Sequence, residues 1–169
     1  EYYGYKAYWD DGAQMIAPND KNTIAEVNKI RNVSDIKFAG KKELITIIGK
    51  EIDEQYIKDL TKISLSPEAI AHHHDMKIVY TPIHGTGIKV IPPALKAFGF
   101  TNVIHVPEQD VISGDFPTVV SPNPEEPAAM AMAVSKAKEV DADIVLASDP
   151  DADRVGAAVK NNEGDWSLL

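Results

Sequence analysis

Polar and hydrophobic positions at the start of the chain follow the pattern of a β-hairpin. In residues 1–17, apolar and aromatic residues flank the sequence DDG, and Asp-Gly is a strong signal for a tight turn between two strands. Two strands alone are not stable in water. We therefore expect this hairpin to be the edge of a larger sheet, and we do not expect Glu1 to be a natural N-terminus.

Helical spacing of the hydrophobic positions follows the hairpin. One predicted helix is capped by Asn19 or Asp20, residues 31–50 are irregular, and a second helix starts after them. Ser66 followed by Pro67 marks the start of a third. The side chains expected to face inward are Ile24, Val27 and Ile30 in the first helix and Ile52, Tyr56, Leu60 and Ile63 in the second.

From residue 77 onward, short apolar runs alternate with helical patterns. The predicted strands are 77–81, 102–106, 143–147 and 155–159, the last returning beside the third. The helix after the first strand ends at Gly99, and Pro92 and Pro93 are tolerable only in its first turn. Residues 107–122 form a long loop. This alternation is typical of the α/β class.

The helix before the third strand opens at the sequence NPEE. Asn123 is the predicted cap, Pro124 the first helical residue and Glu126 the acidic residue of a capping box. The residues expected on its buried face are Met130, Ala133, Val134, Ala137 and Val140.

Composition narrows the function classes. The chain has 169 residues, with 26 acidic against 17 basic side chains and a formal charge of −9. This balance disfavours a nucleic-acid partner, and no apolar stretch approaches the roughly 18 residues of a membrane span. The chain has no cysteine, which excludes disulfides, thiolate metal sites and a cysteine nucleophile. A cytoplasmic protein is the default expectation.

The most informative motif is the sequence SDPDADR, residues 148–154, directly after the apolar run 143–147. Asp149, Asp151 and Asp153 are spaced so that a turning backbone can aim all three carboxylates at one point. Such charges repel one another unless a cation neutralises them. An all-oxygen ligand set suits Mg²⁺ before Ca²⁺, and Arg154 adds a phosphate-binding group.

This motif also has simpler interpretations. An Asp-rich turn after a strand is commonly a solvated turn or a helix cap. An EF-hand loop would need Gly at loop position six and Glu at position twelve, where this chain has Arg154 and Lys160. The buried strand before the loop and the arginine after it favour the metal site.

Several motifs together resemble the α-D-phosphohexomutases, the phosphoglucomutase/phosphomannomutase family. They are GYK and DDGAQ within residues 4–14, HGTG at 84–87, FPTVVSPNPEE at 116–126 and SDPDADR at 148–154, which we call the acidic loop. They occur in the order found in the family and span nearly the whole chain. The resemblance implies a three-layer α/β/α domain with a mixed sheet, preceded by the remnant of a partial α/β domain.

Family members have four domains, and the resemblance implies that this chain is a fragment of one. Residues 1–45 would be the end of domain 1 and residues 46–169 domain 2, which carries the metal loop. The intact enzyme moves a phosphoryl group between the 1- and 6-positions of a hexose phosphate through a phosphoserine and a sugar bisphosphate. That serine lies in a loop resembling TASHNP, which the sequence lacks, so we expect the fragment alone to be inactive and to need the missing domains.

The resemblance also assigns roles to individual residues. Asp149, Asp151 and Asp153 would be the Mg²⁺ ligands, and Arg154 would contact the serine phosphate. Lys6 matches a lysine near the transferring phosphoryl group, although Tyr3 stands where many members have asparagine. The partners implied are a sugar phosphate and a sugar bisphosphate. The sugar itself is not specified by these motifs.

Three other motifs are interpreted as structural. Ser121 resembles the serine nucleophile only superficially, because it belongs to the FPTVVSPNPEE motif, and we expect a loop serine. The HGTG sequence lacks the Gly-Lys-Ser/Thr of a P-loop and predicts a tight strand-to-helix turn. Residues 72–74 are three adjacent histidines, which do not share a face of a helix or strand and are expected at a helix end or in a loop.

Two alternative functions stay open at this point. Asp149 and Asp151 have the spacing of a stand-alone phosphatase with an Asp nucleophile, although such an enzyme needs a lysine and further acidic residues on later strands. A non-catalytic α/β module that only binds metal is the other alternative.

Overall fold

The computed structural model describes residues 7–169. Lys6, expected near the phosphoryl group, lies outside the described residues. The chain divides into two compact units, Glu1–Ile47 and Ile48–Leu169.

In the first unit, the predicted hairpin turn is present between Tyr8 and Gln14. The main chain of Tyr8 bridges that of Gln14 in antiparallel fashion, and Gly12 occupies the turn with a φ of 79°. Helix α1 (Asn19–Val27) and two 3₁₀ turns, Val33–Asp35 and Lys42–Leu44, follow. The predicted capping is wrong, because Pro18 precedes the first helical residue and no side chain caps the helix.

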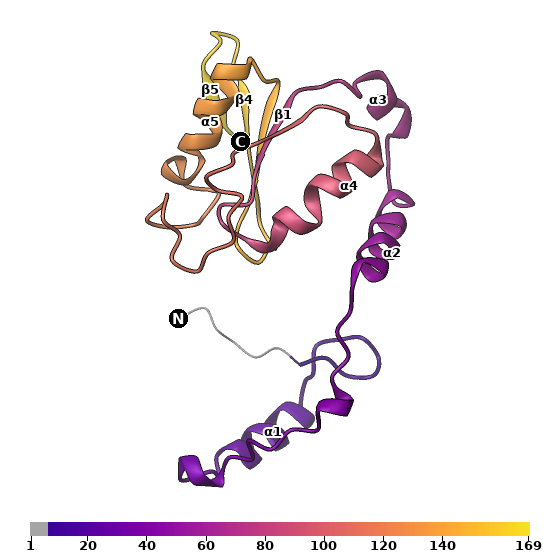
Figure 1. The fold of residues 1–169 in the computed structure, drawn as a ribbon, viewed down its shortest axis with the longest axis vertical. Coiled ribbons are helices and arrows are strands. Elements are labelled where there is room, and N and C mark those ends of the chain that lie inside the picture. Colours follow the sequence, from indigo (N-terminus) through magenta and orange to yellow (C-terminus); the bar gives the residue numbers. More distant parts are fainter. Residues whose placement is uncertain (1–6) are drawn as a thin grey trace. The chain divides into compact units, whose positions relative to one another are not determined.

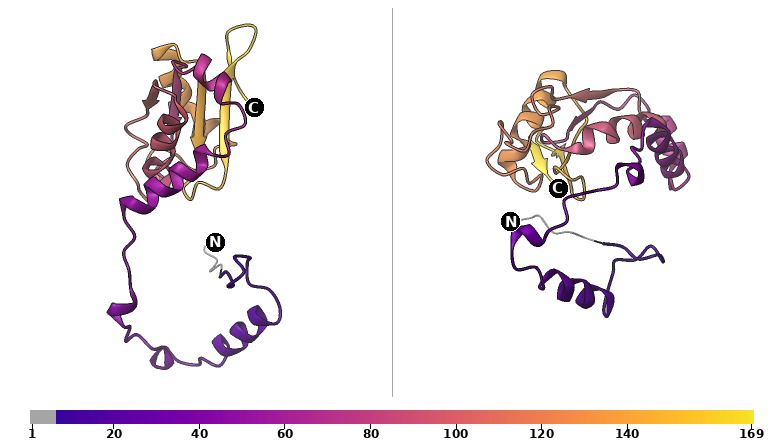
Figure 2. Two further views of the ribbon diagram at one scale, coloured as in Figure 1. Left: turned by 90° about the vertical axis from the view of Figure 1, so that its right-hand side faces the viewer. Right: turned by 60° about the horizontal axis from the view of Figure 1, so that its bottom comes forward.

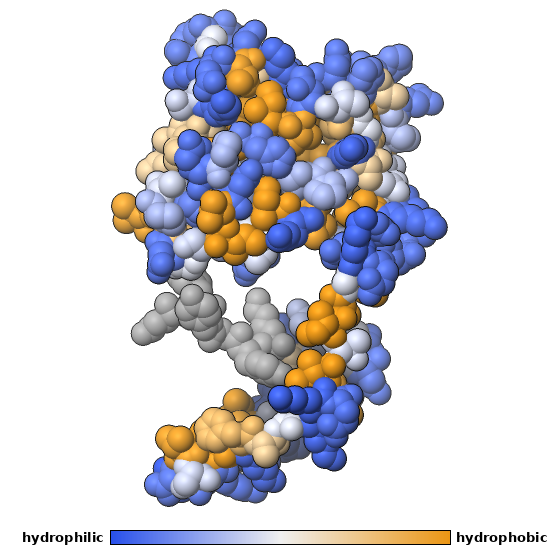
Figure 3. Space-filling view, viewed as in Figure 1, coloured by the Kyte–Doolittle hydropathy of each residue, from blue (hydrophilic) through white to orange (hydrophobic). Residues whose placement is uncertain are grey.

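The expected inward face of α1 is also wrong. Ile24, Val27 and Ile30 are 58%, 53% and 46% exposed. No side chain between residues 7 and 47 is buried, so among these residues the hydrophobic face of the helix has no core to pack on. Figure 3 shows hydrophobic residues at the surface here. The helical spacing of hydrophobic residues correctly predicted that α1 forms, but it does not show which surface packs against the helix.

The second unit is built on a five-stranded mixed sheet with the order β2-β1-β3-β4-β5. Its strands are β1 (Ile78–Thr81), β2 (Val103–His105), β3 (Ile144–Ser148), β4 (Val155–Lys160) and β5 (Trp166–Leu168). Strand β1 runs parallel to β2 and β3, whereas β4 is antiparallel to both β3 and β5. The four predicted strands and the mixed sheet are confirmed. The pattern did not predict β5.

Helix α5 (Pro127–Val140) forms the core with one face of the sheet. Small residues line the contact, so the helix lies close to the strands; Met130 fills the remaining space. The fully buried members are Val79, Val145, Ala147 and Ala158 of the sheet and Ala129, Met130, Ala133 and Ala137 of the helix. The predicted buried face of this helix is thereby confirmed, with Val134 and Val140 only partly buried.

The opposite side of the sheet is covered by helix α4 (Ile91–Phe98), as Figures 1 and 2 show. Pro92 and Pro93 lie in its first turn, and Gly99 ends it with a left-handed φ of 116°, as predicted. Helix α2 (Lys50–Thr61) contacts α4, and α3 (Pro67–His72) follows with Pro67 at its first position. Of the expected α2 stripe, only Leu60 is half-buried; Ile52, Tyr56 and Ile63 are exposed.

The predicted start of α5, at Pro124, is three residues too early. The helix begins at Pro127, with Glu126 at the capping position. The Asn123 side chain instead accepts hydrogen bonds from the Glu125 main chain and from Arg154, while Pro124 is fully buried. Pro124 and Pro127 both suit a first helical turn. Pro124 instead packs against the main chain of Gly156 on β4.

Candidate functional site

The acidic loop lies at the edge of the sheet where the parallel strands end. Strands β1, β2 and β3 are parallel, so their carboxyl ends meet at one edge, where ligands bind in open α/β sheets. Residues 149–154 join β3 to the antiparallel β4. The sequence pattern correctly placed this loop directly after a buried strand.

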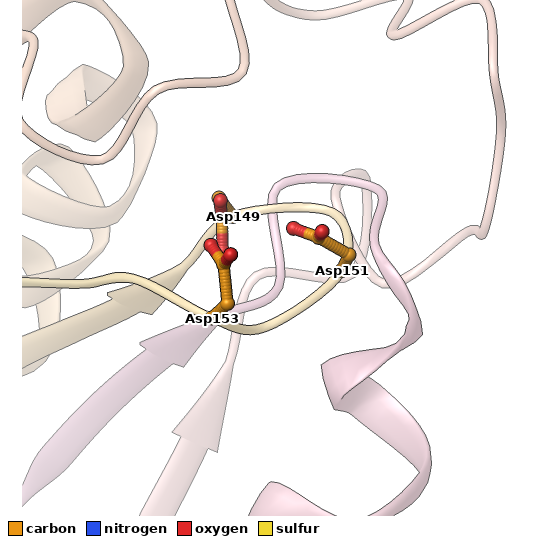
Figure 4. Close-up of side chains that lie close together, drawn as sticks. All are labelled: Asp149, Asp151 and Asp153. Carbon is orange, nitrogen blue, oxygen red and sulfur yellow. The ribbon is translucent and has the colours of Figure 1, made fainter. Parts of the chain in front are cut away.

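The loop brings three carboxylates together. One carboxylate oxygen from each of Asp149, Asp151 and Asp153 lies within 4.8 Å of the others, and Figure 4 shows the side chains turned toward one another. Ala152, between the second and third, has a φ of 61°, which tightens the turn. Asp149 is 1% exposed, whereas Asp151 and Asp153 are exposed. One ligand would therefore come from the interior and two from the surface.

The electrostatics of the three carboxylates fit a cation. The charges of Asp151 and Asp149 raise the pKa of Asp153 above its usual value, which is the mutual repulsion expected of crowded carboxylates. A divalent ion would relieve it, and three carboxylate oxygens are hard ligands of the kind that Mg²⁺ prefers. The donor set of this loop therefore fits Mg²⁺.

Arg154 is tied firmly to Asp149. Its main-chain N–H donates to Asp149 Oδ1 at 3.0 Å, and its Nε donates to Asp149 Oδ2 at 2.9 Å. Burial alone would raise the pKa of Asp149, but the hydrogen bonds and charge of Arg154 outweigh it and hold the pKa below the usual value. Asp149 is thus kept ionised although it is buried.

The guanidinium of Arg154 also spans to a second segment. Its Nη1 donates to Asn123 Oδ1 at 3.3 Å, and the side chain remains 46% exposed. The same two segments also touch at Gly156, the second residue of β4. A Cβ on Gly156 would lie 2.4 Å from the Pro124 carbonyl oxygen. An exposed guanidinium beside three carboxylates can meet an anion that approaches the loop from solvent.

The HGTG sequence forms the predicted tight turn between β1 and the 3₁₀ turn Thr86–Lys89. It also does something that the sequence reasoning missed: Thr86 hydrogen-bonds to the carbonyl oxygen of Pro150 within the acidic loop. The available signal was its place at the end of a strand beside the strand that carries the carboxylates.

The remaining sequence motifs lie apart from this chemistry. Ser121 Oγ donates to Glu126 Oε1 at 2.9 Å, as expected of a loop serine. The three histidines lie exposed at the end of α3. A metal ion can be shared by three or more His, Cys, Asp or Glu side chains whose ligand atoms lie close together. Among the described residues, such a group is formed by Asp149, Asp151 and Asp153.

Across the portion of the chain that the structure describes, none of the helices combines the length and apolar character required to traverse a bilayer.

Comparison with known sequences gives a consistent family match. Residues 54–164 match the family described as phosphoglucomutase/phosphomannomutase, alpha/beta/alpha domain II. Over 98% of its length the chain is 35% identical to a human protein named phosphopentomutase, covering 28% of that protein. It is 33% identical to a probable phosphomannomutase of Haemophilus influenzae, covering 98% of this chain and 34% of the relative.

Two further similarities agree with these. A phosphoglucomutase of Staphylococcus haemolyticus is 32% identical over 97% of this chain, and the match covers 30% of that enzyme. Among solved structures, a phosphoglucomutase/phosphomannomutase family protein of Burkholderia thailandensis superposes with a TM-score of 0.53 at 25% identity, over 68% of this chain and 22% of that one. The chain thus spans about a third or less of the relatives that it matches.

Proposed function

The chain belongs to the phosphoglucomutase/phosphomannomutase family, and on this basis we propose that it is part of a Mg²⁺-dependent enzyme that transfers a phosphoryl group between the 1- and 6-positions of a hexose phosphate. The observation that supports this most directly is the loop in which three carboxylates converge within 4.8 Å, with an arginine attached. Sugar phosphates and sugar bisphosphates are the proposed partners.

The metal would be held by Asp149, Asp151 and Asp153. When bound, Mg²⁺ supplies positive charge that stabilises the oxygens of a transferring phosphoryl group. The chain's own contribution is to keep the ligands ionised and in place. Asp149 is the fixed member, because Arg154 donates to both of its carboxylate oxygens. Asp151 and Asp153 are exposed, and their side chains can adjust around the ion.

Arg154 is the proposed phosphate-binding residue. Its Nε and Nη1 are engaged by Asp149 and Asn123, which fixes the plane of the guanidinium while nearly half of the side chain stays accessible. A preorganised cation of this kind stabilises charge that develops in a transition state without first having to reorganise. Lys6 is proposed for a similar position on the resemblance alone.

Further parts of the proposal also rest on the family resemblance. The phosphoryl group would pass through a phosphoserine outside this chain and a sugar bisphosphate. Residues 1–45 would belong to domain 1 of the enzyme and residues 46–169 to domain 2. The short coverage of the relatives, 28% of the human protein for example, is consistent with a contribution from other domains.

The alternative of a phosphatase that attacks phosphate with Asp149 is less favoured. The matched family is one of phosphomutases, and Asp149 is a buried side chain held by two hydrogen bonds from Arg154 rather than an exposed one. The family match does not favour this alternative or a purely metal-binding module.

Calorimetric titration of the 169-residue chain with MgCl₂ tests the metal site. We expect weak heats of binding for the wild type that are lost in Asp151→Ala. Asp53→Ala, which removes an exposed aspartate on α2, serves as the matched control and should bind like the wild type. Equal heats from wild type and Asp151→Ala would refute the assignment of these ligands.

A further inference from the structure

The turn that follows β1 holds an unfavourable backbone conformation. Ile83 and His84 are consecutive residues with φ values of 46° and 64°. The left-handed region is uncommon for residues other than glycine, and for a β-branched residue such as isoleucine it is an outlier. Such strain persists only where the surrounding structure fixes it.

Buried hydrogen bonds fix this turn. Both His84 and Ile83 are fully buried, and the ring of His84 lies between two partners in the following loop. Its Nδ1 is 2.8 Å from the carbonyl oxygen of Val111, and its Nε2 is 2.8 Å from Thr118 Oγ1. Since a carbonyl only accepts, Nδ1 carries a proton and donates it to Val111.

The main chain of the turn is held as well. The Ile83 N–H donates to Thr81 Oγ1 at 3.1 Å, and the His84 N–H donates to the Gln109 carbonyl at 2.9 Å. Side chain and main chain therefore have partners on both sides of the strained residues.

The supported turn ends against the acidic loop. Both the main-chain N–H and Oγ1 of Thr86 donate to the Pro150 carbonyl, at 2.9 and 3.1 Å. A Cβ on Gly85 would lie 2.4 Å from Pro150 Cα and 2.7 Å from its carbonyl oxygen. Pro150 stands between Asp149 and Asp151. The turn therefore contacts the acidic loop at Pro150, the residue that links Asp149 to Asp151.

We propose that residues 83–86 form a rigid support that sets the position of the acidic loop, with Gly85 and Thr86 as its positioning residues. Strain at Ile83 and His84 is what brings the flat, Cβ-free surface of Gly85 against Pro150. Neither residue touches the metal; each acts through the Pro150 main chain on the spacing of Asp149 and Asp151. This inference rests on the proposed metal site.

Gly85→Ala is the sharpest test, because its effect is steric alone. Gly85 has a φ of −92°, which alanine adopts freely, so the added methyl group acts through its collisions. A Cβ there would lie 2.4 Å from Pro150 Cα and also 2.8 Å from the Pro82 carbonyl oxygen within the turn itself. With Mn²⁺ as an electron paramagnetic resonance probe, titration of the 169-residue chain should show binding at least about tenfold weaker than in the wild type, as for other residues that support metal ligands.

Thr86→Val gives a second, gentler variant with the same fold. It removes one of two hydrogen bonds to Pro150 and should weaken Mn²⁺ binding about threefold, the effect of one modest hydrogen bond. Thr86→Ser should restore wild-type binding. A role in stability alone would lower the midpoint of thermal unfolding without changing the Mn²⁺ affinity of the folded protein, and that result would overturn the proposal.

The chain offers matched controls for both changes. Thr101 donates through its N–H and Oγ1 to the His74 carbonyl at 2.8 and 3.1 Å, the same arrangement away from the acidic loop. Gly114 has open space where a Cβ would stand. Thr101→Val and Gly114→Ala should leave Mn²⁺ affinity unchanged.

The outcomes separate this inference from the function on which it rests. Wild-type binding with unchanged affinity in both Gly85→Ala and Thr86→Val would overturn the support role and leave the metal site standing. Absence of Mn²⁺ binding to the wild type would overturn both.

Discussion

Arg154 has two tasks at the scale of single residues, since it holds Asp149 ionised and also presents a guanidinium to solvent. Lysine cannot reproduce the planar, paired donors. In an active enzyme that contains this chain, we predict that Arg154→Lys lowers kcat far more than it raises KM for the sugar phosphate. Loss of one such transition-state contact typically costs about 2.7–4 kcal/mol, or about 10²–10³ in rate.

Steady-state kinetics at saturating Mg²⁺ and bisphosphate would decide this. Arg31→Lys is the natural control, because Arg31 is the other arginine of the sequence and is exposed. A loss confined to KM, or an unchanged kcat, would mean that Arg154 only braces the loop.

Asp110 gives a prediction on pH. Its Oδ1 is buried without a partner, and Oδ2 pairs with His105 Nδ1 at 3.0 Å. Burial raises its pKa above the usual 3.8, although His105 opposes the shift. A carboxyl whose pKa is higher in the folded state binds its proton more tightly there, so its contribution to stability falls as pH rises through that range.

We therefore expect Asp110→Asn, which does not titrate, to gain stability relative to the wild type as pH increases through the carboxyl range. Urea unfolding of both proteins at a series of pH values measures the difference. Asp115→Asn, at an exposed aspartate of the same loop, should show no such trend. A difference that is constant with pH would contradict the raised pKa.

The sequence predicted the local residues of the site but not their contacts with distant segments. Asp149, Asp151 and Asp153 could be grouped because their spacing within one short loop is local information. The contact of Gly85 with Pro150 could not, because it joins positions 65 residues apart that meet only once β1 and β3 pair. Asn123 was misassigned for the same reason, since its partner Arg154 lies on the far side of α5 in sequence.

Helix α5 carries the prediction at the scale of elements. Met130 is fully buried where the helix meets β1 and β3. Met130→Ala should lower the free energy of unfolding by about 2–5 kcal/mol, the cost of leaving a cavity in a packed core. Chemical denaturation measures it.

Met132 on the same helix is only half-buried, so Met132→Ala removes the same group from a partly solvated position and should cost clearly less. Equal losses from both would show that α5 does not pack as described.

Element types could be predicted better than their surroundings. Helices α1 and α2 and strands β1 to β4 follow from local periodicity, which depends only on neighbouring residues. Burial of the faces of α1 and α2 does not, because it depends on which other surface meets them. Strand β5 was missed because its short run, Trp166–Leu168, has too few positions to show a period of two.

At the scale of the whole molecule, catalysis is expected to need more than this chain. The sequence contains no TASHNP-like loop. Ser121, which resembles the serine of that loop superficially, donates a hydrogen bond to Glu126. We predict that residues 1–169 alone do not interconvert glucose 1-phosphate and glucose 6-phosphate, even with glucose 1,6-bisphosphate present. A coupled assay for glucose 6-phosphate measures this, and turnover that disappears in Ser121→Ala would contradict it.

The pairing of Ser148 with Val155 has a consequence for how this loop can vary between related proteins. The two strands clamp both ends of residues 149–154, so an inserted or deleted residue cannot be absorbed by sliding the flanking chain. It would instead change the separation of all three carboxylates at once, while a substitution alters one. Natural variation here should therefore consist of exchanged side chains at constant length, and gaps in this loop should coincide with loss of the acidic residues.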